Sequence, residues 1–93
     1  MKHLETISLR CFDPDIDGLF RRHIAPILKL EEVKQSFEVS VYQNSRLEMD
    51  IVLAIRSNNG AASYRKSNFA LRLADNLKSF GIINHVVWHE INF

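Results

Sequence analysis

Two histidines near the carboxyl end of the chain have a spacing that invites a chemical interpretation. His85 and His89 are four residues apart. On a helix this spacing places two imidazoles side by side, where they can share a metal ion. On a strand, which rises about 3.3 Å per residue, it separates them by about 13 Å. Because residues 82–92 have a strand-like composition, we expect no shared metal and treat His85 and His89 as candidate catalytic proton acceptors, since imidazole titrates near neutrality.

A second group of residues has the chemistry to bind an anionic or aromatic substrate. Arg10, Tyr42 and Arg56 fall on one face of alternating segments, and Trp88 offers an apolar wall. A guanidinium group binds a carboxylate through two parallel hydrogen bonds, so either arginine is a candidate anchor. The interpretation that we favour for the arginines is ion pairing across strands, with the carboxylates of Glu38, Asp50 or Glu90.

Two other motifs have simpler structural explanations. Residues 13–18, DPDIDG, match the first positions of a calcium-binding EF-hand loop, but the twelfth position is Ile24 instead of a bidentate glutamate. Helix capping by Asp13 or Asp15 explains these acids better. Cys11 is predicted to be a small buried side chain. With no CxxC pair and no glycine-rich phosphate loop, we predict no metal and no cofactor.

Composition restricts the class of protein. The 93 residues suit a single domain spanning 1–93, and the formal net charge of +1 lacks the basic excess that nucleic-acid binding requires. The single cysteine fits a reducing compartment, and the sequence contains neither a signal-like segment nor 18 consecutive apolar residues. We therefore expect a cytoplasmic protein that binds no nucleic acid and no membrane.

Hydrophobic periodicity predicts six elements. Residues 4–12, 36–43, 48–56 and 82–92 alternate as strands do, and residues 16–31 and 63–80 carry apolar stripes at helical spacing. Pro26 predicts a kink or a break near residues 22–25, because its ring would clash with the carbonyl group of Arg22. Ser63 is a candidate N-cap for the second helix, and Gly81 is a candidate for the left-handed position that follows it.

The order of these elements predicts an α+β fold with ferredoxin-like βαββαβ topology. Two right-handed crossovers around a hairpin give a four-stranded antiparallel sheet with both helices on one face. We call the other face the open face. On the first three strands it is predicted to carry Thr6, Ser8, Arg10, Phe12, Glu38, Ser40, Tyr42, Asp50, Val52, Ala54 and Arg56.

The last strand can present either of two sets of side chains to the open face. One set contains His85, Val87 and His89, which we favour, and the other contains Asn84, Val86 and Trp88. Under either parity the open face mixes apolar and charged groups, and such faces typically form an interface or a cavity wall. We expect a homodimer in which two sheets stack, although a monomer with scattered surface hydrophobics is the alternative.

The element order, together with the segment FALRLADNLKSFGIINHVVWHEI over residues 69–91, resembles the dimeric α+β-barrel superfamily of antibiotic-biosynthesis-monooxygenase-like proteins. The resemblance implies a barrel of two stacked sheets and a pocket in each subunit for a small molecule. It also implies that relatives include cofactor-free oxygenases that act on aromatic substrates.

Three functions remain open from the sequence. The first is a dimeric interaction module that uses the open face to bind a partner or a small molecule. The second is a cofactor-free monooxygenase-like enzyme in which His85 or His89 accepts a proton beside Arg10, Arg56, Tyr42 and Trp88. The third, a reader of single-stranded nucleic acid, is disfavoured because residues 48–56 offer no aromatic side chain for stacking.

Overall fold

The fold is an antiparallel sheet with helices on one side. The structure, a computed structural model, describes residues 3–58 and 65–93. Its four strands pair in the order β2-β3-β1-β4, and every pairing is antiparallel. The strands are β1 His3–Cys11, β2 Phe37–Gln43, β3 Asp50–Ser57 and β4 Gly81–His89. The predicted α+β class and antiparallel sheet are confirmed.

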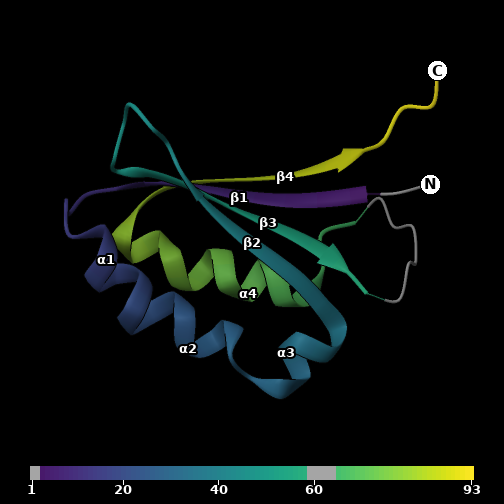
Figure 1. The fold of residues 1–93 in the computed structure, drawn as a ribbon, viewed down its shortest axis with the longest axis horizontal. Coiled ribbons are helices and arrows are strands. Elements are labelled where there is room, and N and C mark those ends of the chain that lie inside the picture. Colours follow the sequence, from purple (N-terminus) through teal and green to yellow (C-terminus); the bar gives the residue numbers. More distant parts are fainter. Residues whose placement is uncertain (1–2, 59–64) are drawn as a thin grey trace.

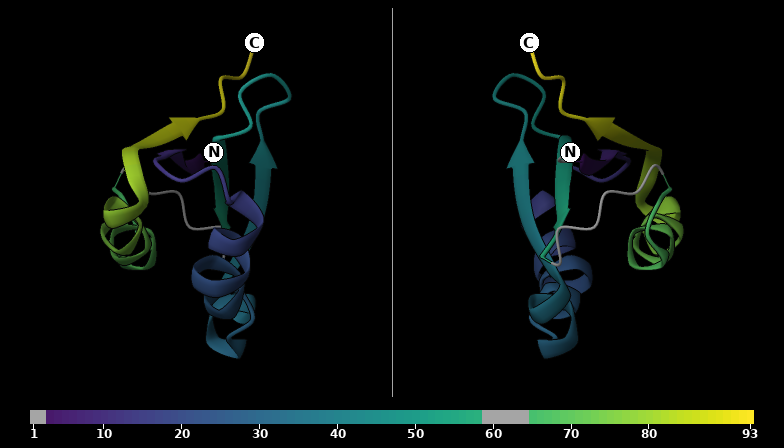
Figure 2. Two further views of the ribbon diagram at one scale, coloured as in Figure 1. Left: turned by 90° about the vertical axis from the view of Figure 1, so that its left-hand side faces the viewer. Right: turned by 90° about the vertical axis from the view of Figure 1, so that its right-hand side faces the viewer.

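The helical segments all lie beneath the same face of the sheet (Figures 1 and 2). The connection between β1 and β2 is divided into short helical pieces, whereas the connection between β3 and β4 contains one longer helix. The segments are α1 Ile16–Leu19, a π-helical turn Phe20–Ile24, α2 Ala25–Leu28, α3 Glu31–Ser36, α4 Asn68–Leu77 and a 3₁₀ turn Lys78–Phe80.

Alternating side chains of the two central strands form the core against these helices. Ile7, Leu9 and Cys11 of β1 are buried, as predicted. The remaining buried apolar residues of this cluster come from β3, the first helical connection and α4; they are Ile51, Leu53, Ile55, Leu19, Ile24, Ala70, Leu73, Ala74 and Leu77. Burial of this apolar surface is the main force that holds the helices to the sheet.

The irregularity predicted near residues 22–25 is present, as a widened turn in place of an interruption of the helix. The helix widens to a π-type turn at Phe20–Ile24, in which the backbone N–H of Ala25 donates to the carbonyl of Phe20. Pro26 follows directly and has no N–H to donate, so the wider turn accommodates its ring where a regular α-helix would clash. The helix starts where expected, because the side chain of Asp15 accepts from the N–H of Gly18 at 3.0 Å.

The second helix differs from the sequence expectation at both ends. The proposed cap Ser63 lies outside the described residues, and α4 begins at Asn68 with Ser67 as its N-cap. Gly81 is not in the left-handed region, because its φ of 171° is extended. It is the first residue of β4 and lies against the backbone of β1, where a Cβ atom would overlap the carbonyl oxygen of Arg10.

Replacing Gly81 with alanine should therefore force β4 away from β1. We expect Gly81→Ala to lower the free energy of unfolding by about 2–4 kcal/mol, because the overlapping atom belongs to backbone and cannot turn aside. Gly18→Ala is the comparison, since an added Cβ there meets the ends of the Asp15 and Arg22 side chains, which can turn aside. Because Asp15 caps the helix through the N–H of Gly18, we expect a smaller loss of about 1 kcal/mol. Urea denaturation of both variants measures the difference, and equal losses would contradict this account.

Candidate functional site

The register of β1 and β4 decides which side chains of the last strand face outward. Ile7, which is fully buried, lies opposite His85, and Thr6 lies opposite Val86. Directly opposed residues in an antiparallel pair share one face of the sheet. The open face therefore carries Ile82, Asn84, Val86 and Trp88 of β4. The favoured prediction that His85, Val87 and His89 occupy the open face is wrong.

Trp88 is fixed on the open face by a hydrogen bond to the central strand. Its indole Nε1 donates to Oγ1 of Thr6 at 2.8 Å. The ring nevertheless remains 54% exposed, because the helices among the described residues all lie on the other side of the sheet. Burying Trp88 would remove more apolar area from water, but the pairing of β1 with β4 places Ile83 and His85, and not Trp88, at the positions that face the helices.

His85 lies on the helix side of β4, away from Arg10 and Tyr42. Its Nε2 atom is buried and has no hydrogen-bond partner among the described residues. Burial lowers the pKa of the His85 imidazole below its ordinary value; the Glu5 carboxylate opposes this shift, and Lys66 adds to it. At neutral pH the imidazole is therefore neutral.

Glu5 is a buried acid that the sequence reasoning did not identify. It is 2% exposed and lies on the helix side of β1. Its carboxylate accepts hydrogen bonds from both the backbone N–H and the hydroxyl of Ser67, the latter at 2.8 Å. The Ser67 Oγ in turn accepts from the N–H of Ala70. Glu5 thus joins the central strand to the N-terminus of α4, where a negative charge is favourable.

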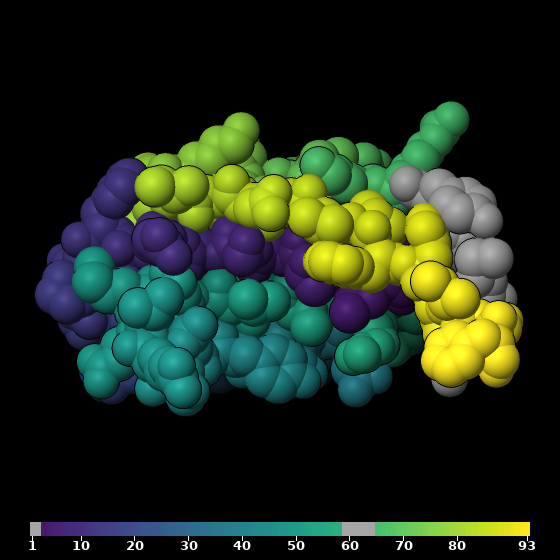
Figure 3. Space-filling model, turned by 90° about the horizontal axis from the view of Figure 1, so that it is seen from above, coloured from purple at the N-terminus to yellow at the C-terminus, as the bar shows by residue number. Residues whose placement is uncertain are grey.

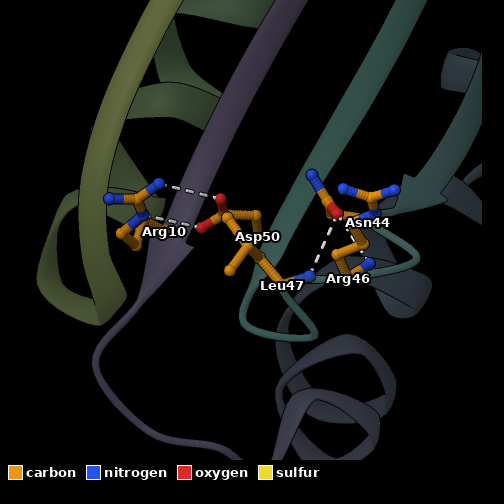
Figure 4. A network of polar contacts seen from close by, with 5 residues as sticks. All are labelled: Arg10, Asn44, Arg46, Leu47 and Asp50. Atoms are coloured by element: carbon orange, nitrogen blue, oxygen red, sulfur yellow. Dashed lines mark hydrogen bonds and ion pairs between the residues drawn. The ribbon is translucent and has the colours of Figure 1, made fainter.

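Arg10 forms the ion pair that the sequence favoured. Its Nε and Nη2 atoms donate to the two carboxylate oxygens of Asp50 at 2.8 and 3.0 Å, so the pair is bidentate (Figure 4). The hydrogen bond from Arg10 lowers the pKa of Asp50, and the same bond raises the pKa of Arg10. The pair joins β1 to β3 on the open face, beside the turn in which Asn44 accepts from the N–H groups of Arg46 and Leu47.

The four residues predicted to bind a substrate divide between two shallow cavities. Arg10 and Tyr42 line a cavity of about 390 Å³, together with Ile82, Asn84 and Asp50. Arg56 and Trp88 line a separate cavity of about 380 Å³ at the other end of the sheet. The predicted single constellation is therefore not assembled within one chain.

His89 borders the second cavity and has an unexpected neighbour. It lies directly opposite His3, the first residue of β1, and both histidines line the cavity with Glu90. His3 was missed because the sequence gives no register for β1 and β4. Within residues 3–58 and 65–93, no cluster of three or more His, Cys, Asp or Glu side chains is arranged to hold a metal ion.

The open face is not covered by any helix of the described residues. Figure 3 views the molecule from this side, and the atoms of β4, β1, β3 and β2 lie beside one another across it in the strand order of the sheet. Large apolar side chains stand along it, with Tyr42 59% and Ile82 64% exposed in addition to Trp88. Phe12, predicted to be here, lies beyond the end of β1 and lines a cavity of about 180 Å³ with His23 and Phe80.

Comparison with models of known protein families, with curated proteins and with solved structures found no match. In the described part of the chain, no helix combines the length and apolar character needed to cross a bilayer. The choice of a candidate site therefore rests on the geometry of the structure alone.

The buried imidazole of His85 should make stability depend on pH. Since its pKa is lower in the folded than in the unfolded chain, the unfolded chain binds the proton more readily. The free energy of unfolding is then highest above the unfolded value of about 6.5 and falls as the pH drops toward the folded pKa. We expect His85→Gln to remove this part of the acid-side loss, as measured by urea denaturation between pH 7.5 and 5.

The matched control is Asn76→Gln, which replaces one exposed non-titrating side chain of α4 by another. It should retain the wild-type dependence of stability on pH. A His85→Gln variant with the same pH dependence as the wild type would show that His85 does not contribute.

Proposed function

We propose that this chain is a ferredoxin-like protein that forms a homodimer through its open face, and that it serves as an interaction module. The observation that carries the proposal is an uncovered four-stranded face that presents Tyr42, Ile82 and Trp88 to solvent. The succession of elements and the strand order β2-β3-β1-β4 support the ferredoxin-like assignment.

The apolar side chains are spread over three of the strands. Tyr42 stands on β2, Ile82 and Trp88 stand on β4, and Val52 of β3 lies partly buried between them. Scattered single hydrophobics are normal on a protein surface, but several large ones on one uncovered sheet face typically mark a contact surface. Covering this set removes apolar area from water, which is the main driving force of association.

The charges of the open face suit a second copy of the same chain. The face carries two basic and two acidic side chains, so its charge is balanced: Arg10, Arg56, Glu38 and Asp50. Arg10 is paired with Asp50, and Glu38 lies opposite Arg56 on the neighbouring strand. Two such faces brought together therefore experience no net repulsion, whereas a strongly charged partner would gain nothing from this surface.

The dimensions of the sheet meet the requirement of a small stable interface. Strands about 4.8 Å apart and seven to nine residues long give a projected area of roughly 500 Å² for each copy. Two copies would then bury roughly 1,000 Å² in total, and the protruding side chains add to this value. Specific interfaces begin at about this size.

A small-molecule site on the open face is less well supported. The cavity of about 390 Å³ beside Tyr42 is open to solvent in a single chain, and the Arg10 guanidinium there is already bound by Asp50. An anion would have to displace that carboxylate. The oxygenase alternative also loses its proposed proton acceptor at this cavity, because His85 lies on the opposite side of the sheet.

A charge placed within the apolar set of the open face should dissociate the dimer. We expect the wild type to sediment with twice the mass of one chain, and Ile82→Glu and Tyr42→Glu to sediment as monomers, because burial of an unpaired carboxylate is costly. Leu71→Glu is the matched control: Leu71 is a 46% exposed leucine on α4, on the other side of the sheet, and its variant should remain dimeric.

The single tryptophan provides a second measurement on the unmodified chain. Trp88 is half exposed in one chain, so its fluorescence maximum should move to shorter wavelength as the protein concentration rises through the dimer dissociation constant. A wild type that remains monomeric at millimolar concentration, with an unchanged emission spectrum, would overturn the proposal.

A further inference from the structure

The outer edge of β4 is a row of unpaired backbone groups. β4 is the last strand in the order β2-β3-β1-β4, so only one of its two edges pairs with another strand. It has nine residues, whereas β2 at the other edge of the sheet has seven. A long edge strand can pair with an additional strand, and proteins commonly prevent this with charged side chains, prolines or bulges.

The hydrogen bonds at one end of the ladder show which groups of β4 point outward. The N–H of Phe12 donates to the carbonyl of Phe80 at 2.9 Å, directly beyond the pair of Cys11 with Gly81. Hydrogen-bonded and non-hydrogen-bonded pairs alternate along an antiparallel ladder. The even-numbered residues of β4 therefore bond to β1, and the odd-numbered residues direct N–H and C=O away from it.

Three odd-numbered residues in the middle of β4 form this free edge, and they are Ile83, His85 and Val87. In the part of the chain that the structure describes, no residue forms a hydrogen bond with their outward N–H and C=O groups. Their side chains lie on the helix side of the sheet, opposite the buried side chains of β1. A dimer that stacks open face on open face therefore does not occupy these backbone groups.

The edge also lacks the features that usually block strand addition. Residues 81–89 contain no Asp, Glu, Lys or Arg and no proline, whereas β2 carries Glu38. An uncharged strand therefore meets no unpaired charge along β4, and the half-buried Ile83 and Val87 are apolar neighbours for its side chains.

The position of α4 decides between two candidate occupants of the edge. Figure 3 shows atoms of α4 (green) beyond the outer edge of β4 (yellow). A second copy that paired antiparallel with β4 about a twofold axis would keep its helices on the same side of the sheet. Its own α4 would then enter the space of the first one. A single extended segment brings no helix with it and can lie along β4 above the overhanging part of α4.

We propose that the outer edge of β4 binds an extended segment of another protein, which adds a fifth strand to the sheet. The partner segment is uncharged and rich in Val, Ile and Thr, and its backbone groups bond to those of Ile83, His85 and Val87. The proposal goes beyond the dimer and does not depend on it, because the edge and the open face use different atoms.

The test uses the full chain and, as the probe, a short peptide of alternating threonine and valine with a lysine at each end. Hydrogen exchange is followed by NMR. The amides of Ile83, His85 and Val87 should exchange quickly in the free chain, because they have no acceptor, and saturating peptide should slow them by about tenfold or more. The amides of Asn84 and Val86, which bond to β1, should exchange slowly in both states.

A proline substitution on each edge separates pairing from other effects. Val87→Pro removes one outward N–H and places a ring in the path of the added strand, so it should weaken peptide binding by about tenfold or more. Val39→Pro is the matched control. The N–H of Asn44 donates to the carbonyl of Asp50, so the odd-numbered residues of β2, including Val39, point outward on the other edge. This variant should bind the peptide as the wild type does.

The exchange measurement on the wild type keeps the proposal testable even if a variant fails to fold. A peptide methylated on its central backbone nitrogens should give no protection. Tyr42→Glu, which should dissociate the dimer, should bind the peptide unchanged, so failure of the dimer and failure of the edge are distinguishable.

Three results would overturn the proposal. They are absence of protection at millimolar peptide, equal protection by the methylated peptide, and protection of β4 amides that increases with protein concentration when no peptide is present. In the third case a second copy of the chain would be the occupant of the edge.

Discussion

The pairing of β1 with β4 is the constraint on which the rest of the structure depends. It runs from His3 opposite His89 to Cys11 opposite Gly81, so it spans the full length of both strands. The missing side chain of Gly81 allows the backbones to meet at Arg10. Once this register is set, Ile83 and His85 must face the helices, and Ile82 and Trp88 must face outward. The character of the open face therefore follows from a contact of main-chain atoms.

β1 also connects the sheet to α4, through the buried side chain of Glu5. The Glu5 carboxylate accepts two hydrogen bonds from Ser67, which caps α4. A buried carboxylate without such donors would be strongly unfavourable, and a helix end without an acceptor would leave amides unsatisfied. Each group thus satisfies the other. The position of α4 beneath β1 and β4 is specified by polar geometry as well as by its apolar stripe.

The sequence was sufficient for the α+β class and the antiparallel sheet because its periodicities are local. Ile7, Leu9 and Cys11 alternate, and Leu73 and Leu77 follow a helical stripe, so the faces that they bury could be read without knowledge of their partners. The irregularity near Pro26 followed from the covalent structure of proline. The Arg10–Asp50 pair could also be anticipated, since both residues belong to strands with an unambiguous parity.

The outward set of β4 could not be obtained in this way. Both parities of residues 82–89 contain apolar and polar side chains, so alternation does not distinguish them. The choice is made by pairing with a strand that is distant in sequence, and by the close approach at Gly81. Because the register of β1 with β4 cannot be obtained from the sequence, the proximity of His3 and His89 was not predicted. The burial of Glu5 was not predicted either, because its acidic side chain gives no local sign of burial.

The central position of β1 has a consequence for the order in which the chain acquires its structure. β1 is synthesised before the strands that flank it, and its hydrogen bonds to β4 involve partners as far apart as Thr6 and Trp88. Such long-range pairing slows folding, because the entropy cost of closing a large loop comes before the favourable contacts between the strands can form. Until residue 89 has left the ribosome, the edge of β1 that pairs with β4 has no partner for its backbone N–H and C=O groups. In a partly synthesised chain of this topology, that unpaired edge is therefore the place most exposed to pairing with a wrong partner.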